Sequence, residues 1–156
     1  MENLIRKADF LRNQYIKVLS ELSADAPRKW GKMNVQQMIE HMSEYVRIAS
    51  GKVTLPNVTP DEHLPRVQAF LESEKPFREN TPNSLMGDDP TPVKHATIQE
   101  AINELQAEID YFFAVHEQEP GRTTPSPFFG VLDFDHQVQL LHKHSTHHLR
   151  QFGLDY

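Results

Sequence analysis

The sequence predicts an all-α fold, a four-helix bundle with a long, proline-rich connection between helices two and three. Two observations predict it. Four segments repeat apolar residues at three- and four-residue spacing, the period of a helix that is buried on one side. No segment shows the strict apolar–polar alternation between turn residues that marks a strand. Because 156 residues is the length of one ordinary domain, we expect a single helical domain over residues 1–156.

The first two expected helices span residues 2–22 and 35–49. Pro27, which interrupts helical structure, lies between them. Asn34 is the expected N-cap of the second helix, because its side-chain oxygen can accept a hydrogen bond from an orphan backbone N–H. Trp30 lies just ahead of that helix and is interpreted as a packing anchor at its start. The apolar stripe of the first helix is Leu4, Ala8, Leu11, Tyr15, Val18 and Leu22. That of the second is Val35, Met38, Ile39, Met42, Val46 and Ala49.

Residues 51–96 form the long connection, and their composition differs from that of the rest of the chain. A short helix is expected at residues 64–71, and the remainder is predicted to be irregular. Long loops in compact domains usually cover a functional site or are disordered. We favour a cover packed on the bundle, because the segment has apolar anchors: Val53, Leu55, Val58, Leu64, Phe70 and Phe77. Its prolines are Pro56, Pro60, Pro65, Pro76, Pro82, Pro90 and Pro92.

The last two expected helices span residues 98–116 and 134–151. Thr97 and Glu100 match a capping box, in which the two side chains satisfy each other's orphan backbone N–H groups. Asp133 is the expected N-cap of the final helix, and Gly153 stands where a helix stop belongs.

The composition of the chain argues against some classes of function and limits the residues that a metal site could use. The net charge is −6 and no basic stripe is present, which argues against nucleic-acid binding. No apolar run reaches the roughly 18 residues of a membrane span, and the N-terminus lacks a signal-peptide pattern, so we expect a cytoplasmic protein. The chain has no cysteine, so any metal site must use histidine, carboxylate or water. A homodimer that pairs through an exposed apolar stripe is compatible with a helical bundle.

Histidine is the strongest anomaly, because four of the nine histidines lie within residues 142–148. A helix turns 100° per residue, which places His148 about 40° from His144 on the edge of the buried face. His147 falls at about 300°, away from the core. Two histidines at i and i+4 can grip one metal ion. His41, on the flank of the second helix, can face this pair if the two helices are neighbours.

Three neutral imidazoles suit zinc, nickel, iron or copper better than calcium or magnesium. Three protein ligands also leave a coordination position open, which is typical of a reactive site. Spacing alone leaves other interpretations open. A single buried histidine such as His41 is more often a hydrogen-bonded core residue, and a histidine-rich helix can be a solvated face. No glycine-rich phosphate loop and no cysteine nucleophile compete with this site, and no catalytic residue is identified.

Two segments carry a resemblance to a known family. The run Asn34-Val35-Gln36-Gln37-Met38-Ile39-Glu40-His41-Met42 resembles the second helix of the DinB/YfiT-like superfamily, and residues 144–151 resemble its C-terminal helix with histidines four apart. Residues 127–132 and the final His-His-Leu-Arg-Gln-Phe-Gly run resemble one branch of that superfamily. The resemblance covers helices two and four and the overall layout. It implies a metal-binding four-helix bundle whose histidine triad corresponds to His41, His144 and His148.

Relatives in this superfamily include transferases and an isomerase that use low-molecular-weight thiols, so the resemblance implies a metal-dependent enzyme of the thiol S-transferase type. Its cofactor would be one divalent transition metal, and its substrate a small molecule such as a thiol. In many relatives the last metal-binding histidine begins the sequence His-Arg-Gly-Gln, whereas this chain has His148-Leu149-Arg150-Gln151. Because of this difference, the resemblance does not identify the substrate.

Tyr45 and Gln151 are candidates for orienting a ligand or the substrate, although packing or capping roles are the alternative. Two other functions stay open. A metal-dependent hydrolase would usually need a carboxylate base, but Glu40 and Glu44 are expected to turn away from the apolar stripe. The second alternative is a non-catalytic, stress-related metal-binding module.

Overall fold

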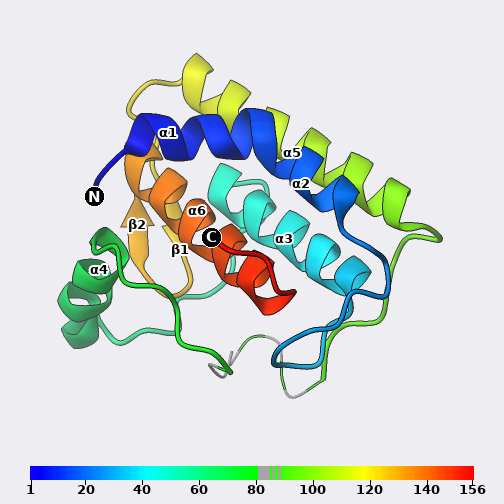
Figure 1. The fold of residues 1–156 in the computed structure, drawn as a ribbon. Helices are drawn as coiled ribbons and strands as arrows, with labels where there is room; N and C mark the ends of the chain where they lie inside the picture. The colour runs from blue at the N-terminus through cyan, green and yellow to red at the C-terminus, as the bar shows by residue number, and fades with distance from the viewer. Residues whose placement is uncertain (81–84, 86, 88) are drawn as a thin grey trace.

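The computed structural model describes residues 1–156 except 81–84, 86 and 88 (Figure 1), so Pro82 lies outside the described residues. The described chain is mostly helical, as predicted, and it also contains one small sheet. Whether the helices form a four-helix bundle with a proline-rich connection stays a prediction. Among the described helices, none combines the length and the hydropathy that crossing a bilayer requires. The elements are α1 (Leu4–Asp9), η1 (Phe10–Gln14), α2 (Tyr15–Glu21), α3 (Val35–Ser50), η2 (Asp61–His63), α4 (Leu64–Glu72), α5 (Ile98–Gln118), β1 (Thr124–Ser126), β2 (Gly130–Leu132) and α6 (Phe134–Gln151).

The first helical segment is interrupted by a π-helical turn, η1, between α1 and α2. Such a turn inserts an extra residue into a helix, and no apolar spacing in a sequence signals it. Leu11 and Tyr15 are buried as predicted, but Leu19 is fully buried where Val18 was expected. Lys7 is buried as well, which the apolar pattern gave no reason to expect.

Both interior helices begin at the predicted caps. The Asn34 side chain accepts a hydrogen bond from Gln37 N at 2.8 Å, and the Gln37 side chain accepts one from Asn34 N at 2.9 Å. Thr97 caps α5 by accepting from Glu100 N at 3.1 Å. The second hydrogen bond of the predicted capping box, from Thr97 N to Glu100, is wrong. The Glu100 carboxylate accepts from Ala96 N instead.

The prediction that the chain has no strands is wrong. Strands β1 and β2 pair antiparallel, with Ser126 opposite Gly130. Each strand is three residues long, which is too short for an alternation pattern, and Pro125 lies inside β1 although proline is depleted in strands. The Ser126 hydroxyl accepts from Phe129 N at 3.2 Å, which fixes the turn between the strands.

Helix α6 is enclosed on most of its circumference. It lies beside α3 and below α1 in Figure 1, while α4 packs against another side of it. More of this helix is buried than one apolar face, since the polar residues Gln137, Gln139, Lys143 and Thr146 are also buried. A smaller apolar cluster lies under α4, apart from the main core, and is formed by Leu71, Phe129 and Leu132 with Phe77 and Leu140 packed against it.

Candidate metal centre

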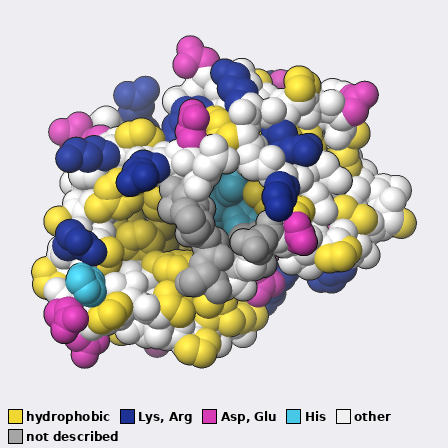
Figure 2. All heavy atoms as spheres, turned by 90° about the horizontal axis from the view of Figure 1, so that it is seen from below, with side chains coloured by type: hydrophobic (Ala, Val, Ile, Leu, Met, Phe, Trp, Pro, Cys, Tyr) yellow, Lys and Arg dark blue, Asp and Glu magenta, His cyan; other side chains and the backbone are white. Residues whose placement is uncertain are grey.

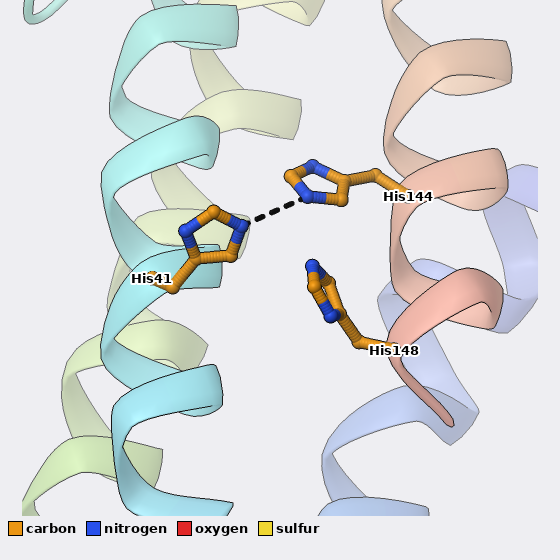
Figure 3. Close-up of side chains that lie close together, drawn as sticks. All are labelled: His41, His144 and His148. Atoms are coloured by element: carbon orange, nitrogen blue, oxygen red, sulfur yellow. Dashed lines mark hydrogen bonds between the residues drawn. The ribbon is translucent and has the colours of Figure 1, made fainter. Parts of the chain in front are cut away.

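Three histidines from two helices converge on one point. His41 projects from α3, and His144 and His148 project from successive turns of α6 (Figure 3). One nitrogen from each ring can be chosen so that all three lie within 4.8 Å of one another. The Nε2 atoms of His41 and His144 are 2.9 Å apart, a hydrogen-bond distance. The structure thus brings together the three residues that the sequence singled out.

The spacing and the chemistry of these nitrogens fit a transition metal ion. Bonds of ~2.1 Å in a tetrahedral site separate ligand nitrogens by roughly 3.4 Å, which lies between the shortest and the longest separations in this cluster. His148 Nε2 is buried and has no hydrogen-bond partner in the described part of the chain. A buried, unpaired polar atom costs about 1–3 kcal/mol. Coordination of an ion would relieve that cost.

The three rings are held in the neutral form that binds metals. Burial lowers the pKa of His41 to about 4, and the nearby imidazole of His147 adds to the shift. Burial, followed by the neighbouring imidazoles, also lowers the pKa of His144 well below its usual range. The pKa of His148 is lowered well below its usual range mainly by burial. Because a metal needs the ring's lone pair, protons compete weakly with an ion at neutral pH.

Gln151 fixes the orientation of His148. The His148 Nδ1–H donates to Gln151 Oε1 at 2.8 Å, so Nε2 carries the lone pair. The other end of the same amide donates from Nε2 to the Trp30 backbone oxygen at 3.0 Å, which prevents the amide from flipping. Partners of this kind commonly set the tautomer and direction of a ligating histidine. The structure therefore places Gln151 where it orients a candidate ligand.

Tyr45 lies one turn beyond His41 on α3. The centroid of its ring is 4.8 Å from those of both His41 and His144, edge-on to the latter. It also lines the cavity described below. Tyr45 therefore packs against two of the three candidate ligands.

The prediction that His147 faces away from the protein interior is wrong. Its ring lies 5.4 Å from Trp30 and 5.8 Å from Phe77, measured between centroids. Burial lowers its pKa to about 4. The helical wheel missed this because Trp30 and Phe77 come from segments far from α6 in the sequence. His147 lies outside the set of three that could share one ion.

A cavity of about 550 Å³ opens beside the triad. Figure 2 shows histidine side chains at the bottom of a hollow in this face of the molecule. Besides the histidines, its walls are largely aromatic and aliphatic, and include Trp30, Met33, Ile48, Phe77, Phe128, Phe129, Leu140 and Leu141. No pattern in the sequence predicts this cavity, because the aromatic residues Trp30, Phe77, Phe128 and Phe129 come from segments that are separate in the sequence.

In the described part of the chain, the carboxylates near the three histidines bind other partners. The Glu40 carboxylate accepts hydrogen bonds from Lys94 N at 2.6 Å and His95 N at 3.3 Å, and Glu44 pairs with Arg47. Asp89 is the described carboxylate on the cavity wall, and its exposed side chain pairs with Lys32 at 3.3 Å. Within the described residues, no carboxylate joins the three histidines.

One of the comparisons with known proteins assigns the chain to a family. Neither a search of curated proteins nor a search of solved structures finds a significant match. A family model for the DinB superfamily matches residues 2–152, which is almost the whole chain and includes all three histidines. By this match the chain belongs to the DinB superfamily.

Proposed function

We propose that the protein is a metal-dependent enzyme of the thiol S-transferase type, built as a single four-helix-bundle domain. One divalent transition ion (zinc, nickel or iron) would be held by His41, His144 and His148. The observation that carries the proposal is the position of this triad at a largely apolar cavity, where no described carboxylate joins the three histidines. A hydrolase would usually need such a carboxylate as its base. A purely structural site would need no cavity.

The chain's own residues prepare the site for a small thiol. The three imidazoles are neutral, and Gln151 directs the lone pair of His148 towards the other two rings. Trp30 and Phe77 pack against the neighbouring His147 and add apolar surface that helps to exclude water. A bound divalent ion would supply a positive charge that favours the thiolate form of a thiol.

The thiol must come from a small molecule, because the chain has no cysteine. In the transfer, its sulfur forms a bond to an electrophilic carbon while the bond from that carbon to its leaving group breaks. A halide, for example, departs with the bonding electron pair, and the proton of the thiol passes to bulk water. No residue of the protein is chemically changed by the reaction.

The proposal is tested by adding thiols to cobalt-substituted protein. A thiol that reaches the triad should change the visible spectrum of the cobalt and saturate with one thiol per chain. The matching alcohol should leave the spectrum unchanged. If the spectrum stays unchanged across a panel of cellular thiols, the proposal of a thiol S-transferase is wrong.

Gly31 is expected to matter for metal affinity through Gln151. It has φ +77°, and a Cβ at this position would lie 2.6 Å from Gln151 Nε2. Gly31→Ala should therefore displace the amide that orients His148 and weaken metal binding about tenfold, the low end of effects at residues that support ligands. The measurement is a competition titration against a chromophoric chelator.

Gly121→Ala is the matched control for this substitution. Gly121 has φ +85°, so alanine is strained there as well, but no described atom lies within 4 Å of the added Cβ. Both variants should lose similar stability, whereas only Gly31→Ala should lose metal affinity. Equal affinities in the two variants would show that the contact between Gly31 and Gln151 does not support the site.

A further inference from the structure

The walls of the cavity offer flat apolar surfaces close to the triad. The Phe77 ring lies 6.1 Å from the His144 ring and 6.5 Å from the Phe129 ring, measured between centroids. Trp30 covers a further side, against His147. Aromatic walls of this kind favour an aromatic ligand, because rings stack offset or edge to face at such distances.

The described walls carry little charge. Most of the wall residues are apolar or aromatic side chains. Lys32 and Asp89 lie on the wall as well, but they pair with each other and their side chains are 62% and 88% exposed. An anionic ligand would lose its hydration here, and the described cation on the wall, Lys32, already pairs with Asp89. The walls therefore favour an uncharged ligand.

Gln137 adds one polar feature to this apolar wall. Its side chain is buried, and its Nε2 donates to Thr124 Oγ1 at 2.9 Å. The same hydroxyl donates to the Ala49 backbone oxygen at 2.9 Å, so it must accept from Gln137, which fixes the direction of the amide. Gln137 lines the cavity, and its hydrogen bond to Thr124 uses Nε2, which leaves Oε1 as the acceptor that it can offer to a ligand. An N–H or O–H group on a ligand would pair with it.

We propose that this cavity binds an uncharged aromatic compound with one hydrogen-bond donor, and that this compound is the electrophile that accepts the thiol. The second clause rests on the proposed function, whereas binding itself does not. Trp30, Phe77 and Phe129 contact the ring, and Gln137 Oε1 accepts the donor. Recognition then comes from shape and one hydrogen bond, without an ion pair.

Trp30 provides a direct test, because it is the only tryptophan in the chain and it lines the cavity. Metal-free protein is titrated with 4-tert-butylbenzamide and with 4-tert-butylbenzoate, two probes of similar shape. Only the amide carries an N–H donor, and only the carboxylate carries a charge. The amide should change the fluorescence of Trp30 to saturation. The carboxylate should bind at least about tenfold more weakly, since its charge finds no partner. Equal binding of the two probes, or saturation by neither, would overturn the proposal.

Two variants test the polar contact. Gln137→Leu keeps the bulk of the side chain but removes the acceptor, and should weaken binding of the amide about tenfold. Gln99→Leu, at an exposed position on α5, should bind like the parent protein. If Gln137→Leu does not fold, the comparison of the two probes on the parent protein still decides. Because these experiments use neither metal nor thiol, their failure is distinguishable from failure of thiol transfer.

Discussion

Replacing His148 with alanine is expected to lower the affinity for a divalent transition ion by more than about 100-fold, because it removes a ligand and not merely a residue that supports one. Two imidazoles, His41 and His144, would remain, and a pair holds an ion weakly. The same result is expected for His41→Ala. Purified variants should therefore contain almost no metal by elemental analysis, where the parent protein takes up about one ion per chain.

His147→Ala is the matched control on the same helix. The ring packs against Trp30 and Phe77 and lies outside the set of three that could share an ion, so metal content should remain nearly unchanged. Circular dichroism would confirm that all variants keep their helices. Full metal retention in His148→Ala, or an equal loss in His147→Ala, would mean that the triad is not the binding site.

The helix ends could be predicted because the signals for them are local. Asp133 accepts a hydrogen bond from His136 N at the start of α6, and Gly153 takes φ +88° just past its end. Asn34 likewise caps α3 through its near neighbour Gln37. The turn η1 and the paired strands were missed for the opposite reason. Their formation depends on packing between segments, which leaves no mark in residue spacing.

The same division separates the parts of the site that were predicted from those that were missed. His144 and His148 lie one turn apart, so their common direction follows from helix geometry. The orientation of His147 could not be predicted, because it depends on loops that lie more than 60 residues away in sequence. Gln137 was missed because a buried glutamine on a helix looks like any other polar position until the residues around it are known.

Metal-loaded protein is expected to accelerate the conjugation of a low-molecular-weight thiol to 1-chloro-2,4-dinitrobenzene, and His144→Ala is expected to reduce the rate to background. This substrate is uncharged and aromatic, although it lacks the donor that would pair with Gln137, and its chloride leaves as the carbon–sulfur bond forms. Among the three candidate ligands, His144 is the one whose ring contacts Phe77 on the cavity wall, at 6.1 Å between centroids, and it lies within hydrogen-bond distance of His41. Its loss therefore removes a ligand from the side that faces the substrate. The measurement is the absorbance of the conjugate with each thiol of the panel.

His63→Ala is the control for this experiment. His63 lies at the start of α4, does not line the cavity and is not part of the triad. It should keep the full rate, which would show that losing one imidazole is not in itself harmful. Melting curves should establish that His144→Ala is folded before its rate is interpreted. If no thiol is turned over while the metal-loaded protein hydrolyses an aromatic ester in a His144-dependent way, the site activates water instead. If neither reaction occurs, the triad binds a metal without catalysis.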